Sequence, residues 1–104
     1  MQKVTRGDVV AVLITRGYGS GWSTSNKEHP EILFDPATIA WVEGGKKGKG
    51  ALAADLKARF KGIYLAGLDN LTVAWVPVGV PFEIAEYDGS ESIRYRDQIN
   101  WRIA

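Results

Sequence analysis

The stretch "VVAVLIT", residues 9–15, decides the fold because it combines β-branched residues with almost no polar alternation. Such a run is typical of a strand that is buried on both faces, as in the centre of a sheet. The run ends where Arg16 and Gly17 follow it. We therefore predict a central strand over residues 9–15, with the rest of the chain packed around it.

The next segment, residues 17–29, is rich in glycine, serine, threonine, asparagine and aromatic residues, and this composition predicts a long loop. Helix signals follow it. Asp35 can cap a helix, Pro36 suits the first helical position, and Gly44 can take the left-handed conformation just past the end. We expect a short helix over residues 36–43.

A second helix is predicted within "ALAADLKARF", where Leu52, Leu56 and Phe60 recur on one helical face and Gly62 follows as a stop. The connection before it, "GGKKGKG" (residues 44–50), lacks the spacing and the preceding strand of a phosphate-binding loop. Two interpretations stay open for this connection. Lys46, Lys47 and Lys49 either form a mobile cationic loop that meets anions, or they simply face water.

The second half of the chain alternates with a period of two, which is typical of half-buried strands. Residues 71–76 and 82–85, separated by "PVGVP", predict two strands joined as a hairpin. The tail places Ile93, Tyr95, Ile99, Trp101 and Ile103 on one face of an extended segment. Asp97 interrupts that face, so two short strands are expected in the tail.

These elements predict an α+β fold, with an antiparallel sheet of four to five strands and two short helices packed on one side. A chain of 104 residues suits a single domain over residues 1–104. The net charge of +1 gives no strong nucleic-acid signal. The absence of cysteine and of any long apolar stretch leads us to expect a soluble cytoplasmic protein without disulfides or a membrane partner.

The sequence offers few residues suited to catalysis or metal binding, because it has one histidine, His29, and no cysteine. We expect a protein that is not an enzyme and that needs no cofactor or metal. Asp88 and Glu91 in "EYDGSES" could form half of a carboxylate site. We interpret them instead as solvated residues of a turn, in which Asp88 and Gly89 tolerate the required backbone angles.

The loop motif "GYGSGWST" has the composition of a binding edge, because glycines leave one side uncrowded while two rings and several hydroxyls project. The rings can stack on a base, and the hydroxyls can bond its polar edges. Alternatively, both rings fold back and cap the end of the sheet. The candidate ligand contacts in this loop are Tyr18, Gly19, Trp22, Ser23 and Thr24.

The polar face of the tail supplies the remaining candidates, Arg94 and Arg96, together with Arg102. Arginines on one side of a strand can meet phosphates or an acidic protein. The alternative is that these charges keep an outer sheet face soluble and discourage edge-to-edge aggregation. Both interpretations place the arginines in water in the free protein.

The motifs "TRGDVVAVLITRGYGSGWST", "HPEILFDP" and "DNLTVAWVPVGVPFEIAEYDGSESI" together resemble a family of small uncharacterised proteins of bacteriophages and prophages. The resemblance spans most of the chain and weakens between Gly44 and Ile63 and after Arg94. It implies a phage setting and, from that setting, a role in counter-defence inside the host cell. The matching positions that it singles out are the glycine and tryptophan loop and the "EYDG" turn.

We therefore expect a homo-oligomeric binding protein that captures a small nucleotide-like ligand. In this hypothesis Tyr18 or Trp22 stacks on the base, and arginine or lysine side chains neutralise the phosphate. The first alternative is a protein inhibitor of a host defence effector, such as a CRISPR effector, because tryptophan, tyrosine and arginine anchor protein interfaces. The second alternative is a minor component of phage assembly.

Overall fold

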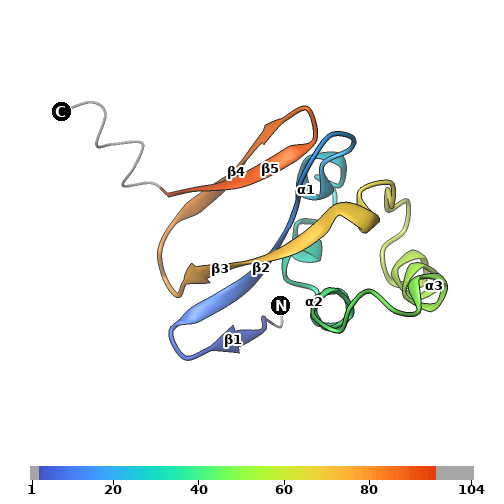
Figure 1. Ribbon diagram of the computed structural model, residues 1–104, viewed down its shortest axis with the longest axis horizontal. Helices are drawn as coiled ribbons and strands as arrows, with labels where there is room; N and C mark the ends of the chain where they lie inside the picture. The colour runs from blue at the N-terminus through green and yellow to red at the C-terminus, as the bar shows by residue number, and fades with distance from the viewer. Residues whose placement is uncertain (1–2, 96–104) are drawn as a thin grey trace.

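The structure is a computed structural model that describes residues 3–95, and it confirms the predicted α+β class (Figure 1). Five antiparallel strands divide between a three-stranded sheet and a separate two-stranded sheet. The strands are β1 (Thr5–Arg6), β2 (Val9–Thr15), β3 (Leu71–Pro77), β4 (Phe82–Tyr87) and β5 (Ser90–Tyr95). The helices are α1 (Trp22–Ser25), α2 (Pro36–Glu43) and α3 (Lys49–Arg59), with 3₁₀ turns η1 (Pro30–Phe34) and η2 (Leu68–Asn70).

Strand β2 is the centre of the larger sheet, as the apolar run predicts. It pairs with β1 on one side and with β3 on the other, in a register that joins Thr15 to Leu71 and Val9 to Pro77. Its last five residues are buried. The prediction of a central strand buried on both faces is therefore confirmed.

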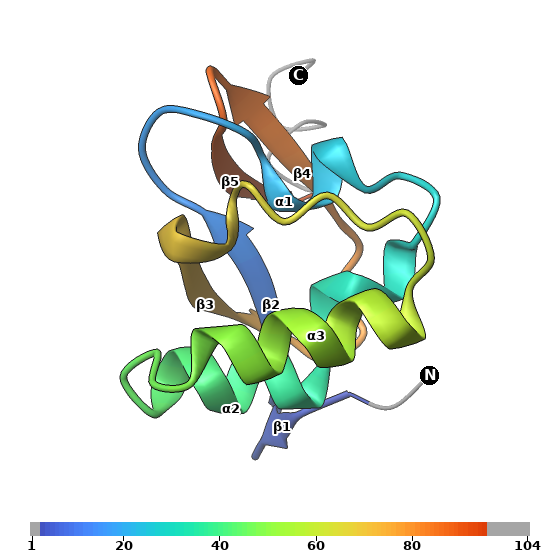
Figure 2. The same cartoon turned by 90° about the vertical axis from the view of Figure 1, so that its right-hand side faces the viewer.

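The two faces of β2 supply two different cores, because successive side chains of a strand point to opposite sides. Ala11 and Leu13 pack with apolar residues of α2 and α3, while Val12 and Ile14 pack with the hairpin of β4 and β5. Figure 2 shows α2 and α3 together on one side of the larger sheet. The sheet thus lies between a helical layer and a second, smaller sheet.

Helix α2 has the predicted bounds, but the prediction of a left-handed Gly44 is wrong, because Gly44 has a φ of −82° and Gly45 takes the left-handed conformation at 91°. The Asp35 side chain accepts a hydrogen bond from the backbone N–H of Thr38 at 3.1 Å, and Pro36 occupies the first helical position. Helix α3 begins at Lys49, inside the segment expected to be a glycine and lysine connection. Gly48 precedes it with a φ of 79°, a left-handed conformation that favours glycine.

The cap of α2 is also an ion pair with α3. The two oxygens of Asp35 accept from the Arg59 guanidinium at 2.6 and 3.0 Å. Burial raises the pKa of the Asp35 carboxyl, but the hydrogen bonds from Arg59 and Thr38 outweigh it and hold the pKa below its ordinary value of 3.8. Because the folded state favours the charged carboxylate, this pair stabilises the fold above that value and loses its contribution as the pH falls below it.

Asp35→Asn is expected to lower the free energy of unfolding near neutral pH by about 2 kcal/mol, the usual contribution of hydrogen bonds to a charged group. It should also flatten the acid-induced loss of stability. Urea denaturation between about pH 7 and about pH 3 measures both effects. Asp55→Asn is the control, since Asp55 pairs with the same arginine from a half-exposed position. Identical pH dependence in the wild type and Asp35→Asn would contradict the assignment.

The predicted hairpin between residues 71–76 and 82–85 is wrong. Both strands form, but β3 pairs with β2, and β4 pairs with β5. Pro77 and Pro81 bracket the connection, and proline has no N–H to continue a ladder of hydrogen bonds. The chain therefore leaves one sheet at Pro77 and enters the other at Phe82.

The tail prediction is confirmed as far as the structure describes it. On β5, Ile93 and Tyr95 pack against the core of the smaller sheet, whereas Arg94 is exposed. Residues 96–104, which include Arg96, Arg102 and the second predicted tail strand, lie outside the described residues. The long loop predicted over residues 17–29 contains one helical turn, α1.

Candidate functional site

The carboxylate of Glu91 joins the residues that precede and follow the "GYGSG" segment. This side chain is 1% exposed. One oxygen accepts from the backbone N–H of Thr15 at 3.0 Å and from its hydroxyl at 3.1 Å. The other accepts from the N–H groups of Ser23 at 3.0 Å and Thr24 at 3.3 Å. Glu91 therefore ties three chain segments together, and its interpretation as a solvated turn residue is wrong.

The glycines of this segment allow close backbone contact. The N–H of Gly19 donates to the carbonyl of Asp88 at 3.1 Å, and a Cβ at Gly89 would overlap the carbonyl oxygen of Gly19. A Cβ at Gly21 would likewise overlap the hydroxyl of Thr24. The predicted turn angles are confirmed, since Asp88 and Gly89 both have positive φ. The glycines thus bring the loop after β2 against the turn between β4 and β5, as Figure 1 shows.

Trp22 is not available for stacking. Its side chain is 0% exposed within the core that faces α2 and α3, and its indole Nε1 donates to the carbonyl of Ile32 at 3.3 Å. The ring lies inside because α1 turns it toward the sheet, where a large apolar surface gains most from burial. The assignment of Trp22 as a ligand contact is therefore wrong, and this ring caps the core.

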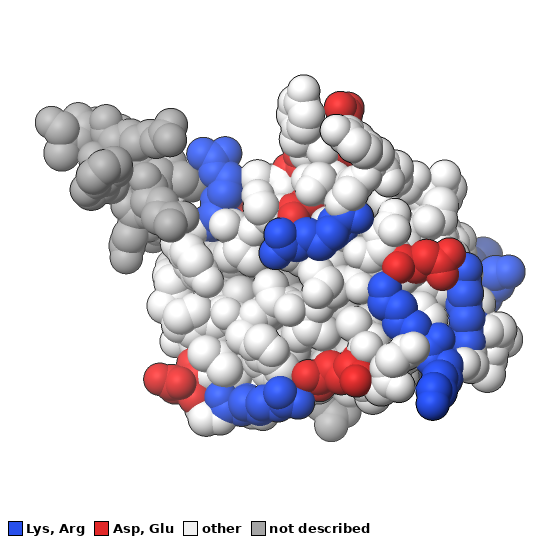
Figure 3. Space-filling view, viewed as in Figure 1, with Lys and Arg blue, Asp and Glu red and all other residues white. Residues whose placement is uncertain are grey.

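Tyr18 behaves in the opposite way, with its side chain 83% exposed at the tip of the loop. Two other exposed tyrosines lie on segments that contact the same loop. Tyr87, 78% exposed, is next to Asp88, and the hydroxyl of Tyr64, 49% exposed, accepts from Ser20 Oγ at 3.4 Å. We call Tyr18, Tyr64 and Tyr87 the tyrosine surface. At the top of Figure 3 the neighbouring loop tips project mainly uncharged side chains.

The other predicted contacts are spread over the molecule. Ser23 and Thr24 use their N–H groups to bind Glu91, which leaves their hydroxyls for other partners. Arg94 lies toward the far end of the smaller sheet, because Tyr87 pairs with Ser90 at one end and Phe82 with Tyr95 at the other. Its guanidinium is 4.0 Å from a Glu83 oxygen. The structure therefore does not bring Arg94 together with Tyr18, and Arg96 lies outside the described residues.

The cationic connection between the helices is anchored locally. Lys46 Nζ donates to the backbone carbonyl of Asp69 at 2.6 Å, and Lys49 Nζ pairs with the Asp69 carboxylate at 2.8 Å. Two of the three lysines are thus engaged with η2. Lys47 is exposed.

His29, the one histidine of the chain, makes contacts that support the fold. His29 Nε2 lies 2.7 Å from the carbonyl of Lys61, and its ring packs beside Phe60. Within residues 3–95 no group of three or more histidine or acidic side chains is placed to hold a metal ion. In the same range, no helix has the length and apolar character needed to cross a bilayer.

Sequence reasoning missed Glu91, although a signal was present. The period-two pattern of Ile93 and Tyr95 extends backwards to position 91, which places this carboxylate on the inward face of β5. The turn composition around it masked that register. No family model, curated protein or solved structure gives a significant match to this chain.

Proposed function

We propose that this protein is a non-enzymatic binding protein that docks onto another protein through the tyrosine surface. The main support is that, among the residues that the structure describes, three of the four large exposed hydrophobic side chains lie on the loop after β2 or on segments hydrogen-bonded to it. Isolated exposed apolar residues are ordinary, whereas a cluster of them indicates an interaction surface. Tyrosine is among the residues that dominate binding energy at protein interfaces.

The composition of the loop supports this proposal. Tyrosine, serine and glycine are the residues that antibody loops use for protein recognition, because tyrosine offers a large amphipathic contact area with only two side-chain torsions. The "GYGSG" segment, residues 17–21, combines all three. Arg16 and Asp88 border the tyrosines as exposed charges, which matches the polar rim of a typical interface.

The support beneath the loop makes binding less costly in entropy. Glu91 holds the N–H groups that follow the loop, and the hydrogen bond from Gly19 to Asp88 joins the loop to the neighbouring turn. A surface that is already ordered loses less conformational freedom when it binds. The tyrosines are therefore displayed from a fixed backbone.

The phage resemblance specifies the partner within this proposal. The partner is a protein of the bacterial host, and inhibition of a defence effector in the host cytoplasm is the role that follows. Stacking of a nucleotide base on Trp22 is excluded because that ring is enclosed, whereas stacking on the exposed Tyr18 stays a prediction. A second copy of the chain and a phage structural protein are the competing occupants of the tyrosine surface.

Tyr18→Ser and Tyr87→Ser are each expected to weaken partner binding about thirtyfold, which corresponds to an interface hot spot of about 2 kcal/mol. The measurement starts from a stoichiometric complex isolated from host lysate, followed by titration calorimetry with the purified partner. Val78→Ser is the matched control. Val78 is 55% exposed but lies after Pro77, at the opposite end of the strand pair, and its variant should bind normally.

Light scattering measures the oligomeric state of the purified chain and so distinguishes a second copy of the chain from a host protein as the partner of the tyrosine surface. If Tyr18→Ser converts a dimer to a monomer, the tyrosine surface is a contact between copies and the proposed host partner is excluded. Recovery of the protein in purified virions through the same tyrosines would assign a structural role instead. Unchanged affinity of both tyrosine variants for a purified partner would also overturn the proposal.

A further inference from the structure

A groove beside α1 has features of a small-molecule site and is separate from the tyrosine surface. It consists of two adjoining cavities, of about 340 and 250 Å³, that share Thr24 and Lys27 in their walls. We call this the Lys27 groove. The larger cavity lies just above the lower limit of about 300 Å³ for ligand pockets and the smaller one just below it, so a ligand that extends through both would fill a pocket of ordinary size.

The larger cavity offers an apolar wall. Leu33, Phe82 and Ile84 line it and are half-buried, and the exposed Glu83 lies beside them in the same wall. The inner atoms of the three apolar residues pack on the core of the smaller sheet, which fixes the side chains, while the remaining surface faces the groove. A fixed apolar wall that includes an aromatic ring suits a planar ring such as a nucleobase. Ser23 and Thr24 also line this cavity, and they bring polar groups to the wall opposite the ring.

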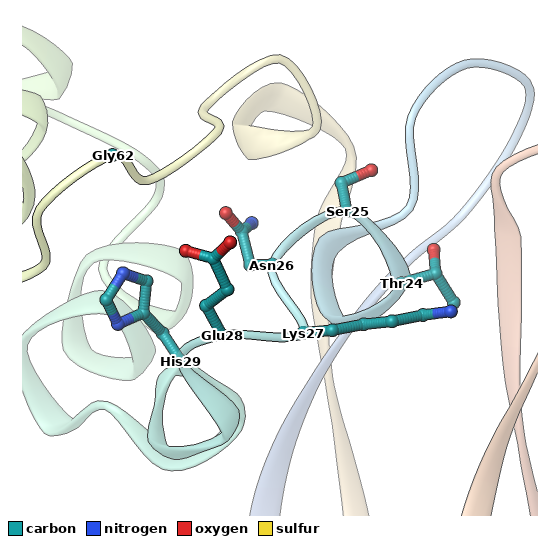
Figure 4. Close-up of a pocket in the computed structure, with 7 residues that line it drawn as sticks. All are labelled: Thr24, Ser25, Asn26, Lys27, Glu28, His29 and Gly62. Atoms are coloured by element: carbon teal, nitrogen blue, oxygen red, sulfur yellow. The ribbon is translucent and has the colours of Figure 1, made fainter.

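Lys27 stands where the two cavities meet. In the part of the chain that the structure describes, no carboxylate lies within ion-pair distance of its amine. Figure 4 shows the side chain running toward Thr24, away from Glu28 and His29. An exposed lysine at the junction of two cavities is a point charge suited to a phosphate.

The smaller cavity has a different chemistry. Asn26 lines it but is already engaged, since its amide donates to the carbonyls of Trp22 and Tyr64 and its oxygen accepts from the N–H of Tyr64. Glu28 is exposed and forms no ion pair with any described residue. A carboxylate in this position accepts hydrogen bonds from hydroxyls and repels phosphate, so the ligand group that matches this smaller cavity is a sugar.

We propose that the Lys27 groove binds a nucleotide whose diphosphate joins a nucleoside to a second sugar, the class of nucleoside diphosphate sugars. The base lies against Phe82, the phosphate meets Lys27, and hydroxyls of the distal sugar donate to Glu28. This arrangement places the base on the apolar wall of the larger cavity, the diphosphate at the lysine that both cavities share, and the sugar beside Glu28. It places nucleotide recognition on residues that carry no part of the tyrosine surface.

Titration calorimetry with ADP-ribose as the probe tests this site. Lys27→Glu is expected to weaken binding at least thirtyfold, and Glu28→Ala about tenfold. Adenosine, which lacks phosphate, should bind at least tenfold more weakly than ADP-ribose to the wild type. ADP lacks the distal sugar, so its affinity should not respond to Glu28→Ala. Lys47→Glu is the matched control, because it makes the same charge change on the connection between the helices and should bind ADP-ribose normally.

The two proposals fail separately. Tyr18→Ser should bind ADP-ribose as the wild type does, and Lys27→Glu should retain the protein partner. Absence of heat with ADP-ribose, ADP and adenosine at millimolar concentration would overturn the nucleotide site and leave the tyrosine surface intact. Equal affinity of Lys27→Glu and the wild type for ADP-ribose would also overturn it.

Discussion

Glu91→Ala is expected to lower the free energy of unfolding by at least about 3 kcal/mol, because each buried donor that loses its acceptor costs about 1–3 kcal/mol. The carboxylate accepts from the N–H groups of Thr15, Ser23 and Thr24 and from the Thr15 hydroxyl. Alanine offers no acceptor in its place. Since a domain of this size has a total stability of about 5–15 kcal/mol, a loss of this size is large. Urea denaturation followed by tryptophan fluorescence measures it.

Two further variants show whether the acceptor itself is responsible. Glu91→Gln keeps one oxygen and nearly the same shape, so it should lose clearly less stability than Glu91→Ala. Glu83→Ala removes an exposed carboxylate from the same two-stranded sheet and should change stability by no more than about 0.5 kcal/mol. Equal losses for Glu83→Ala and Glu91→Ala would show that Glu91 has no special part in holding the loop.

Gly89→Ala is expected to produce the second large effect, a loss of about 3 kcal/mol or more, because it adds an overlap with the backbone of a neighbouring loop to the ordinary cost of a left-handed backbone. Gly89 has a φ of 86°, and its added Cβ would overlap the backbone of Gly19. That neighbour is a backbone segment that cannot rotate away as a flexible side chain can. The loop that carries Tyr18 must therefore separate from the turn that carries Tyr87, and partner binding should weaken together with thermal stability.

Gly79→Ala isolates the backbone contribution to that loss. Gly79 has a similar φ of 79°, but nothing lies within 4 Å of an added Cβ. Its variant should therefore lose only about 1–2 kcal/mol, the cost of the left-handed conformation for a residue with a side chain. A difference of less than about 0.5 kcal/mol between the two variants would mean that close contact between Gly19 and Gly89 does not matter.

Features with a local cause were predicted well from the sequence. The start of α2 follows from Asp35 and Pro36, which are contiguous with the helix and act on its own backbone groups, and its end precedes a pair of glycines of which Gly45 is left-handed. The central position of β2 follows from its uninterrupted apolar run. In each case the signal lies within the element that it specifies.

Features that depend on a distant partner were predicted poorly. The alternation of β3 and β4 shows that each is a strand, yet it contains nothing that selects β2 or β5 as the neighbour. The candidate site shows the same division. The sequence singled out the loop of Tyr18 as a surface, but it also placed Trp22 there, because a ring in a glycine-rich segment can point either way.

By itself, the amino-acid sequence determined the α+β class, the central strand and the bounds of α2, since periodicity and capping residues act over a few neighbouring positions. Only the tertiary structure decided which strands pair, that Trp22 is enclosed, and that Glu91 joins segments 76 positions apart. The physical reason is that a pattern specifies which side of an element is buried. The identity of the atoms that cover that side depends on how the whole chain closes around it.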